Sequence, residues 1–277
     1  MRWISMTLVI VSVALLAEIV DPSFGSMEYL SDGWKSIGWN PAGLVEIEKN
    51  SIYVDVVYRT SSNRDIKGFN AVYISGRNES NLAGAVGIYR FFSIDFESLG
   101  TYYEVSGVSE INWGVGLGLE KVKDEVNPNG YYSVFLDLGI LGKIDVFEYS
   151  FSLRKLRLWS ERFSSYLIGD FGIGFGLDFK TFEIGLNLSS YEAEIFKVHG
   201  GVEVEFPFVG MSLGGGMILD GSDMEYTLRV DGSIYFSGTD FSIGVYLAQN
   251  LSDIDVPDQY WEVELPTVIS SFFILRM

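Results

Sequence analysis

An alternation of period two recurs along most of the chain and limits what it can fold into. In residues 110–120, EINWGVGLGLE, bulky apolar residues from Ile111 to Leu119 alternate with Asn or Gly. Successive side chains of a β-strand point to opposite sides, so this segment predicts a strand with one apolar and one small or polar face. Turn signals separate further segments of this kind, so we predict an all-β chain of about 12–14 strands. The other strand candidates are residues 51–59, 69–77, 83–92, 131–141, 143–154, 165–179, 181–189, 193–206, 207–219, 223–236, 239–250 and 267–276.

The chemistry of the two strand faces distinguishes between two all-β architectures. A soluble sandwich turns its apolar face toward a shared core and exposes mainly Lys, Glu and Thr, but here the second face carries Gly, Asp, Asn and Ser. In residues 165–179, Phe171 and Phe175 share one face, while Asp170 and Asp178 share the other. A transmembrane barrel places bulky apolar residues against lipid, and its tilted strands need ~9–11 residues to cross the bilayer. We therefore predict a transmembrane antiparallel β-barrel, with a soluble periplasmic β-protein as the alternative.

The N-terminus has the features of a secretion signal. Arg2 supplies a positive charge, residues 4–17 are mostly apolar, and small residues precede a plausible cleavage site before Ser26. The apolar run is shorter than the ~20 residues that a spanning helix needs, which favours cleavage over anchoring. We predict a signal peptide over residues 1–25, an N-terminal hatch segment over 26–50 and a barrel over 51–277, located in the outer membrane.

Composition excludes several classes of function. The 277-residue chain contains no Cys, which excludes disulfides. Its net charge of −18 opposes binding to nucleic acid. No nucleophile, base and orienting group stand out as a set, and His199 is the only His. The Gly-rich stretches GIGFG and GLGLE lie within predicted strands rather than before a helix, so they do not predict phosphate loops. We expect no enzymatic activity, no catalytic residues, no metal and no cofactor.

The segment GWNPAGL, residues 38–44, lies directly before the first predicted strand. Pro41 fixes its own φ and restrains Asn40 to extended geometry, while Ala42 and Gly43 allow the backbone to approach a barrel wall closely. The segment resembles the N-terminal hatch of the long-chain fatty-acid transporter (FadL-like) family of outer-membrane barrels, and also that of the PorV-like barrels. The resemblance implies that this segment tucks into the barrel. The predicted hatch residues are Trp34, Trp39, Asn40, Pro41, Ala42, Gly43 and Leu44.

The resemblance also implies a function. Fatty-acid transporters suggest passive transport of small hydrophobic or amphipathic molecules across the outer membrane. PorV-like barrels suggest instead a non-transporting structural barrel or a docking partner for secreted proteins. The expected partners are outer-membrane lipid, a small hydrophobic or amphipathic solute and, in the second case, a secreted protein. The sequence departs from the fatty-acid transporters in three ways. The chain is shorter, its hatch is small, and the residues predicted to line its lumen are not mainly apolar.

The polar faces of the predicted strands define a lumen in which acids outnumber bases. An acidic, hydrated lumen favours cations or neutral polar solutes, because charged rings set the selectivity of a pore. A mixed lumen blocked by a hatch suits amphipathic molecules, and a closed barrel filled by mutually paired charges is the third possibility. The predicted lumen-lining residues are Asn112, Asp137, Asp170, Asp178, Glu183, Lys197, His199, Glu203, Glu225 and Arg229.

Overall fold

The computed structural model describes most of the chain after its N-terminal region. The predicted signal peptide, residues 1–25, and the first part of the predicted hatch, residues 26–32, lie outside the described residues. Nothing in the described part forms a helix that is long and apolar enough to cross a membrane. The described ranges are 33–37, 39–60, 65–94, 96–124, 127–162, 169–191, 195–220, 226–251 and 267–277.

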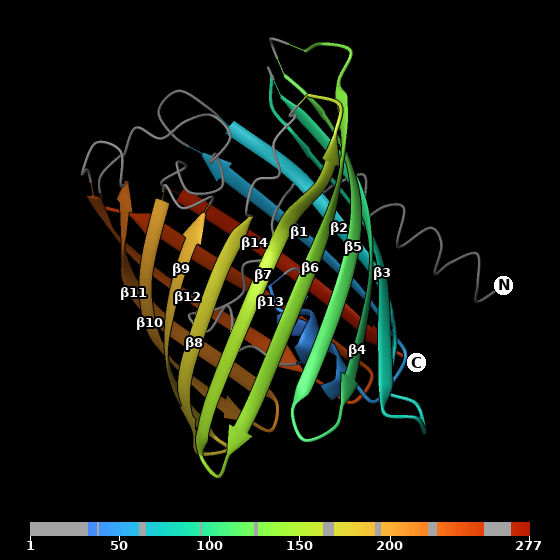
Figure 1. Ribbon diagram of the computed structural model, residues 1–277. Coiled ribbons are helices and arrows are strands. Elements are labelled where there is room, and N and C mark those ends of the chain that lie inside the picture. The colour runs from blue at the N-terminus through green and yellow to red at the C-terminus, as the bar shows by residue number, and fades with distance from the viewer. Residues whose placement is uncertain are drawn as a thin grey trace, which may run out of the picture.

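The described residues form fourteen strands that close into one antiparallel barrel (Figure 1). Each strand pairs with its neighbours in sequence, and β1 pairs with β14 along the full length of both strands to close the sheet. The predicted antiparallel barrel and its strand number are confirmed. The strands are β1 (Ser51–Thr60), β2 (Asp65–Ser75), β3 (Leu82–Phe92), β4 (Glu97–Val108), β5 (Asn112–Lys123), β6 (Tyr131–Ile144), β7 (Phe147–Ser160), β8 (Asp170–Asp178), β9 (Phe182–Tyr191), β10 (Ile195–Phe206), β11 (Val209–Asp220), β12 (Tyr226–Ser237), β13 (Phe241–Asn250) and β14 (Thr267–Arg276).

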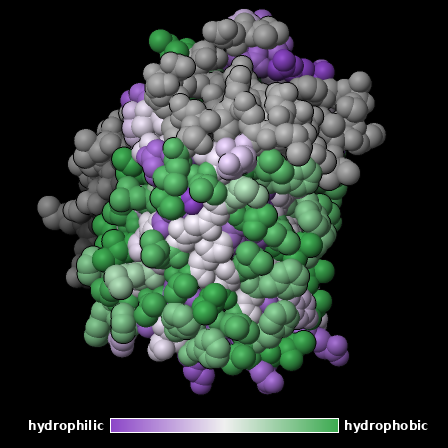
Figure 2. Space-filling view, turned by 90° about the vertical axis from the view of Figure 1, so that its left-hand side faces the viewer, coloured by the Kyte–Doolittle hydropathy of each residue, from purple (hydrophilic) through white to green (hydrophobic). Residues whose placement is uncertain are grey.

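The bulky apolar faces of the strands point outward. On β5, Val115, Leu117 and Leu119 are 41%, 51% and 43% exposed, whereas the glycines between them are buried. On β8, Phe175 is 42% exposed and Asp170 only 8%. Figure 2 shows apolar side chains predominating on one face of the barrel, with a few more polar residues between them. Such a wall suits contact with lipid tails, and the closed sheet leaves no strand edge unpaired in the hydrocarbon region.

The two ends of the barrel carry different connections. At one end, which we call the turn end, β1 begins, β14 ends and the strands are joined by residues 76–81, 109–111, 145–146, 179–181, 207–208 and 238–240. At the opposite end, which we call the loop end, they are joined by residues 61–64, 93–96, 124–130, 161–169, 192–194, 221–225 and 251–266. The longest connections, 161–169 and 251–266, are both at the loop end.

Two local features of the barrel were not predicted from the sequence. The strand β4 was not among the strand candidates, because bulky Tyr103 points outward while the adjacent Tyr102 is partly buried, which obscures the period of two. The register between β6 and β7 shifts around Asp137, which faces both Arg154 and Lys155. Lys155 has a φ of 50° and its amide donates to Asp137 Oδ1 at 2.6 Å. This β-bulge places Asp137 and Arg154 together on the inner side of the wall.

Candidate functional site: the plugged lumen

Two short 3-10 turns, η1 (Gly33–Ser36) and η2 (Pro41–Glu46), lie inside the barrel toward the turn end (Figure 1). We call these turns and the residues that link them the plug. Ile37, Leu44 and Val45 are 0% exposed, although the plug is too short to have a core of its own. Their burial therefore comes from the barrel wall.

The Asn-Pro-Ala turn begins η2 through two hydrogen bonds of one side chain. Asn40 is extended, with φ −144° and ψ 104°, and its Oδ1 accepts from the Ala42 amide at 3.1 Å. Its Nδ2 donates to the Ile140 carbonyl of β6 at 3.1 Å. Pro41 occupies the first helical position, where a missing N–H costs nothing. Asn40 thus caps the turn and joins it to the wall at the same time.

A pair of glycines in the wall makes room for this turn. Gly114 of β5 and Gly139 of β6 stand directly opposite each other in the ladder. A Cβ at Gly139 would overlap Asn40 Oδ1 and lie 3.0 Å from the Ala42 nitrogen, and a Cβ at Gly114 would overlap the Pro41 backbone. Two adjacent strands therefore need glycine here because the plug backbone packs against them.

Hydroxyl groups of the wall satisfy the plug backbone. Ser106 Oγ on β4 donates to the Ala42 carbonyl at 3.0 Å and accepts from the Val45 amide at 3.1 Å. Ser152 Oγ on β7 donates to the Trp39 carbonyl at 2.8 Å. These bonds pair buried backbone groups of the plug with the wall and fix both the position and the orientation of η2.

A second set of contacts holds η1 against β10, β12 and β14. The Lys35 ammonium contacts Glu203 and lies 2.8 Å from Glu205, and the Tyr235 hydroxyl donates to both carboxylates. The Trp34 ring stacks on Phe272 with 4.5 Å between the ring centroids. The plug is thus attached to opposite sides of the barrel and spans the lumen near the turn end.

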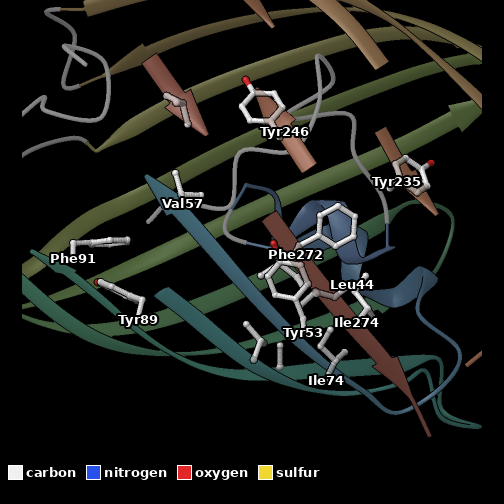
Figure 3. Packing of buried hydrophobic residues seen from close by; sticks show 14 of the residues in the cluster. Leu44, Tyr53, Val57, Ile74, Tyr89, Phe91, Tyr235, Tyr246, Phe272 and Ile274 are labelled. Carbon is white, nitrogen blue, oxygen red and sulfur yellow. The ribbon is translucent and has the colours of Figure 1, made fainter. Parts of the chain in front are cut away.

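The inner wall has an apolar sector next to the plug. The prediction that apolar residues do not line the lumen is therefore wrong for this sector. Figure 3 shows Tyr53, Phe272 and Ile274 beside Leu44 of the plug, with Tyr89 and Phe91 elsewhere on the wall. Leu44 was predicted as a hatch residue, but these wall residues were not predicted, because strands such as β1 and β14 carry apolar residues on both faces, which hides the inward face. We call the wall residues of this cluster the apolar wall: Tyr53, Val57, Ile66, Val72, Ile74, Ala85, Tyr89, Phe91, Tyr235, Tyr246, Ala248, Val268, Phe272 and Ile274.

The polar sector of the lumen lies on β9 to β12. His199 and Asp231 are buried and in contact with each other, at 1% and 5% exposure. Arg229 donates to Asn250 Oδ1 at 3.1 Å, and Lys197 is 7% exposed one inward position from His199. The predicted lumen residues Lys197, His199 and Arg229 therefore face the inside of the barrel, where Asp231 and Asn250 pair with two of them.

Other predicted lumen residues lie at the turn end. Asn112 Nδ2 donates to Glu46 Oε1 of the plug at 2.8 Å. Asp178 contacts Lys143, and Glu183 stands opposite Asp178 in the ladder between β8 and β9. These three side chains belong to the rim of the barrel rather than to its middle.

The remaining predicted residues are spread over three places. Asp137 and Asp170 lie on either side of β7 and face Arg154. Glu203 contacts Lys35 of the plug, as described above, and Glu225 lies outside the described residues. The predicted set is therefore a lining distributed over the lumen, and the part of the chain that the structure describes brings no three acidic or His side chains together as metal ligands.

A pocket of about 340 Å³ lies between the plug and the wall at the turn end. Trp34 of the plug and the following residues Ile47 and Lys49 line the pocket on one side, and Ile74 and Ile274 of the wall line it on the other. The plug therefore fills the described lumen incompletely beside β1, β2 and β14.

Comparison with known proteins supports the fold. No protein-family profile and no curated protein sequence matches the chain. Among solved structures, the TodX deltaS2S3 mutant, a monoaromatic hydrocarbon channel, is similar with a TM-score of 0.61 and 8% identity, over 93% of this chain and 98% of that chain. Omp33 of Acinetobacter baumannii gives a TM-score of 0.48 and 10% identity, over 83% of this chain and 99% of that chain.

The closed barrel and the bulky apolar side chains on its outer surface together define the class. The protein is a fourteen-stranded outer-membrane β-barrel with a short N-terminal plug.

Proposed function

We propose that this barrel is a channel for the passive passage of small hydrophobic or amphipathic molecules across the outer membrane. The observation that carries the proposal is the apolar wall, which places aromatic side chains inside the lumen next to a plug. These side chains form a cluster whose members are 0–9% exposed. An apolar solute that entered between them would gain roughly 25 cal/mol for each Å² of its apolar surface removed from water.

Two resemblances support the proposal. The Asn-Pro-Ala segment before β1 resembles the hatch of the fatty-acid transporter family. The barrel is similar in fold to TodX, whose structure is described as a monoaromatic hydrocarbon channel.

The geometry also suggests a direction of travel. Outer-membrane barrels have short periplasmic turns and longer extracellular loops, so the turn end faces the periplasm. A solute would enter at the loop end, move along the apolar wall and reach the plug last. The pocket beside Trp34 and Ile274 would receive the solute as it leaves the apolar wall, once the plug moves.

Uptake by liposomes that contain the purified protein tests this proposal. We expect toluene or benzyl alcohol to enter these liposomes faster than protein-free liposomes. Phe91 is 6% exposed and faces the lumen, whereas Ile88 on the same strand is 52% exposed and faces lipid. Because an aromatic contact contributes about 0.5–1.5 kcal/mol, Phe91→Ser should slow uptake by about 2- to 10-fold. Ile88→Ser is the matched control and should leave uptake unchanged.

The result would also decide between transport and docking. Equal uptake by protein-containing and protein-free liposomes would overturn the transport proposal. If a secreted protein then co-purified with the barrel, the docking function that the PorV-like resemblance implies would take its place.

A further inference from the structure

The inner wall carries a buried carboxylate, Glu104, close to the plug on its loop-end side. Glu104 is 3% exposed, and its position on β4 is the next inward one after Ser106, which bonds the plug backbone. Asp137 holds the equivalent position on β6, two residues before Gly139, which packs against Asn40. The two acids therefore belong to the first layer of wall residues beyond the plug.

The two side chains converge over a glycine. Gly116 of β5 stands between them in the ladders, opposite Glu104 on one side and Asp137 on the other. A Cβ at Gly116 would lie 3.1 Å from both Glu104 Cγ and Asp137 Cβ, so both side chains lean over this position. On its other side Glu104 stands opposite Ala85, another small residue. The residues directly opposite Glu104 on both neighbouring strands are therefore small.

The two acids differ in their partners. Asp137 accepts the Lys155 amide at 2.6 Å and faces Arg154, whose guanidinium lies 4.6 Å from the centre of the Trp39 ring. Glu104 Oε2 is buried and has no hydrogen-bond partner within the described residues. A buried acid that lacks a partner is costly, so the unpaired oxygen of Glu104 favours a guest that brings a positive charge or a strong hydrogen-bond donor.

The surroundings of Glu104 also select the body of the guest. Tyr102 lies on the same face of β4, one inward position away and roughly 7 Å along the strand, and packs against the apolar wall. The Tyr102 hydroxyl donates to Asn70 at 3.3 Å, so its orientation is fixed. A ring next to a carboxylate suits a molecule with an apolar body and an ammonium head, because aromatic faces attract cations as well as apolar groups.

We propose that Glu104 is the specificity-determining residue of the lumen and binds the ammonium group of small apolar or aromatic amines. This inference deepens the proposed channel function and rests on it for its biological meaning. It predicts that the channel prefers amines to neutral molecules of the same shape and disfavours carboxylates.

Three probes of the same shape test the inference: benzylamine, benzyl alcohol and benzoate. Ligand-detected NMR with the folded barrel in detergent should show that benzylamine binds at least about tenfold more tightly than benzyl alcohol, which corresponds to about 1.4 kcal/mol. Benzoate should bind most weakly. Glu104→Gln keeps the size of the side chain and should abolish the preference for the amine, while Glu104→Asp keeps the charge and should retain part of it. Glu183→Gln, which changes an acid at the barrel rim, is the matched control and should keep the preference.

Several results would overturn the assignment. Equal binding of benzylamine and benzyl alcohol would do so, as would a preference that survives in Glu104→Gln. If K⁺ displaced benzylamine at concentrations where choline did not, the layer would be a site for inorganic cations, and the assignment to organic amines would be wrong.

The liposome assay separates this inference from the channel function. If benzyl alcohol enters the liposomes but the amine preference is absent, the channel function stands and the role of Glu104 falls. If no solute enters but the amine preference in binding depends on Glu104, the site stands and the channel function falls.

Discussion

Gly114 and Gly139, which lie against the plug, provide a direct test of how the plug is attached to the barrel wall. We consider Gly139→Ala, which adds one methyl group at a position where a Cβ would overlap Asn40 Oδ1. Asn40 must then move, and its two hydrogen bonds, to the Ala42 amide and the Ile140 carbonyl, are lost. At about 0.5–1.5 kcal/mol for each bond, the plug loses about 1–3 kcal/mol of its attachment. A loss of about 2 kcal/mol raises the population with an undocked plug about 30-fold.

The absence of Cys from the chain makes this population measurable. Val45 is 0% exposed in the docked plug, so a single Val45→Cys substitution should react with a maleimide only when the plug leaves the wall. We expect Gly139→Ala to raise the labelling rate about 30-fold and to increase the conductance of the barrel in planar bilayers.

A lipid-facing glycine provides the control. A Cβ at Gly200 would lie 3.4 Å from its nearest neighbour, an ordinary contact, so Gly200→Ala should label like the parent. Heat-modifiable gel mobility confirms that both variants fold. Equal labelling of Gly139→Ala and Gly200→Ala would refute the claim that the Gly114–Gly139 pair fixes the plug.

Two further predictions concern the contacts of the plug, and a third concerns the outer surface of the barrel. Ser152→Ala removes the hydrogen bond to the Trp39 carbonyl, and the loss of about 1 kcal/mol should raise maleimide labelling of Val45→Cys about fivefold. Lys35→Met removes the cation between Glu203 and Glu205. Maleimide labelling of Ser36→Cys, at a position that is 0% exposed, should then rise. Unchanged labelling would show that this contact does not hold η1. Leu117→Arg places a charge on the lipid-facing wall and should lower the free energy of unfolding in lipid vesicles by about 2–4 kcal/mol, as measured by urea titration; a neutral effect would contradict the outward orientation of β5.

The sequence was sufficient to predict the barrel because its strongest signal is local. Alternation along β5 and β8 identifies the strands and their outward faces, as the exposed Phe175 and buried Asp170 show. The turn at Asn40 was also recognisable, because Asn-Pro-Ala directly before the first strand is a compact local pattern.

The parts that were missed depend on contacts between distant segments. Gly114 and Gly139 read as ordinary strand glycines until the register between β5 and β6 places them opposite each other and beneath the plug. The apolar wall was hidden because strands such as β1 carry apolar residues on both faces. Glu104 was missed along with β4, in which Tyr102 and Tyr103 face different sides of the wall.

Movement of the plug is the central requirement of the transport account, and a reversible crosslink tests it most directly. The Val45 amide lies 3.1 Å from Ser106 Oγ, so Val45→Cys combined with Ser106→Cys places two thiols where plug and wall meet in a chain that has no other Cys. We predict that the oxidised double variant in liposomes takes up no benzyl alcohol above the protein-free rate, and that reduction with dithiothreitol restores uptake. Equal uptake in the oxidised and reduced states, with the crosslink verified by mass spectrometry, would contradict the account.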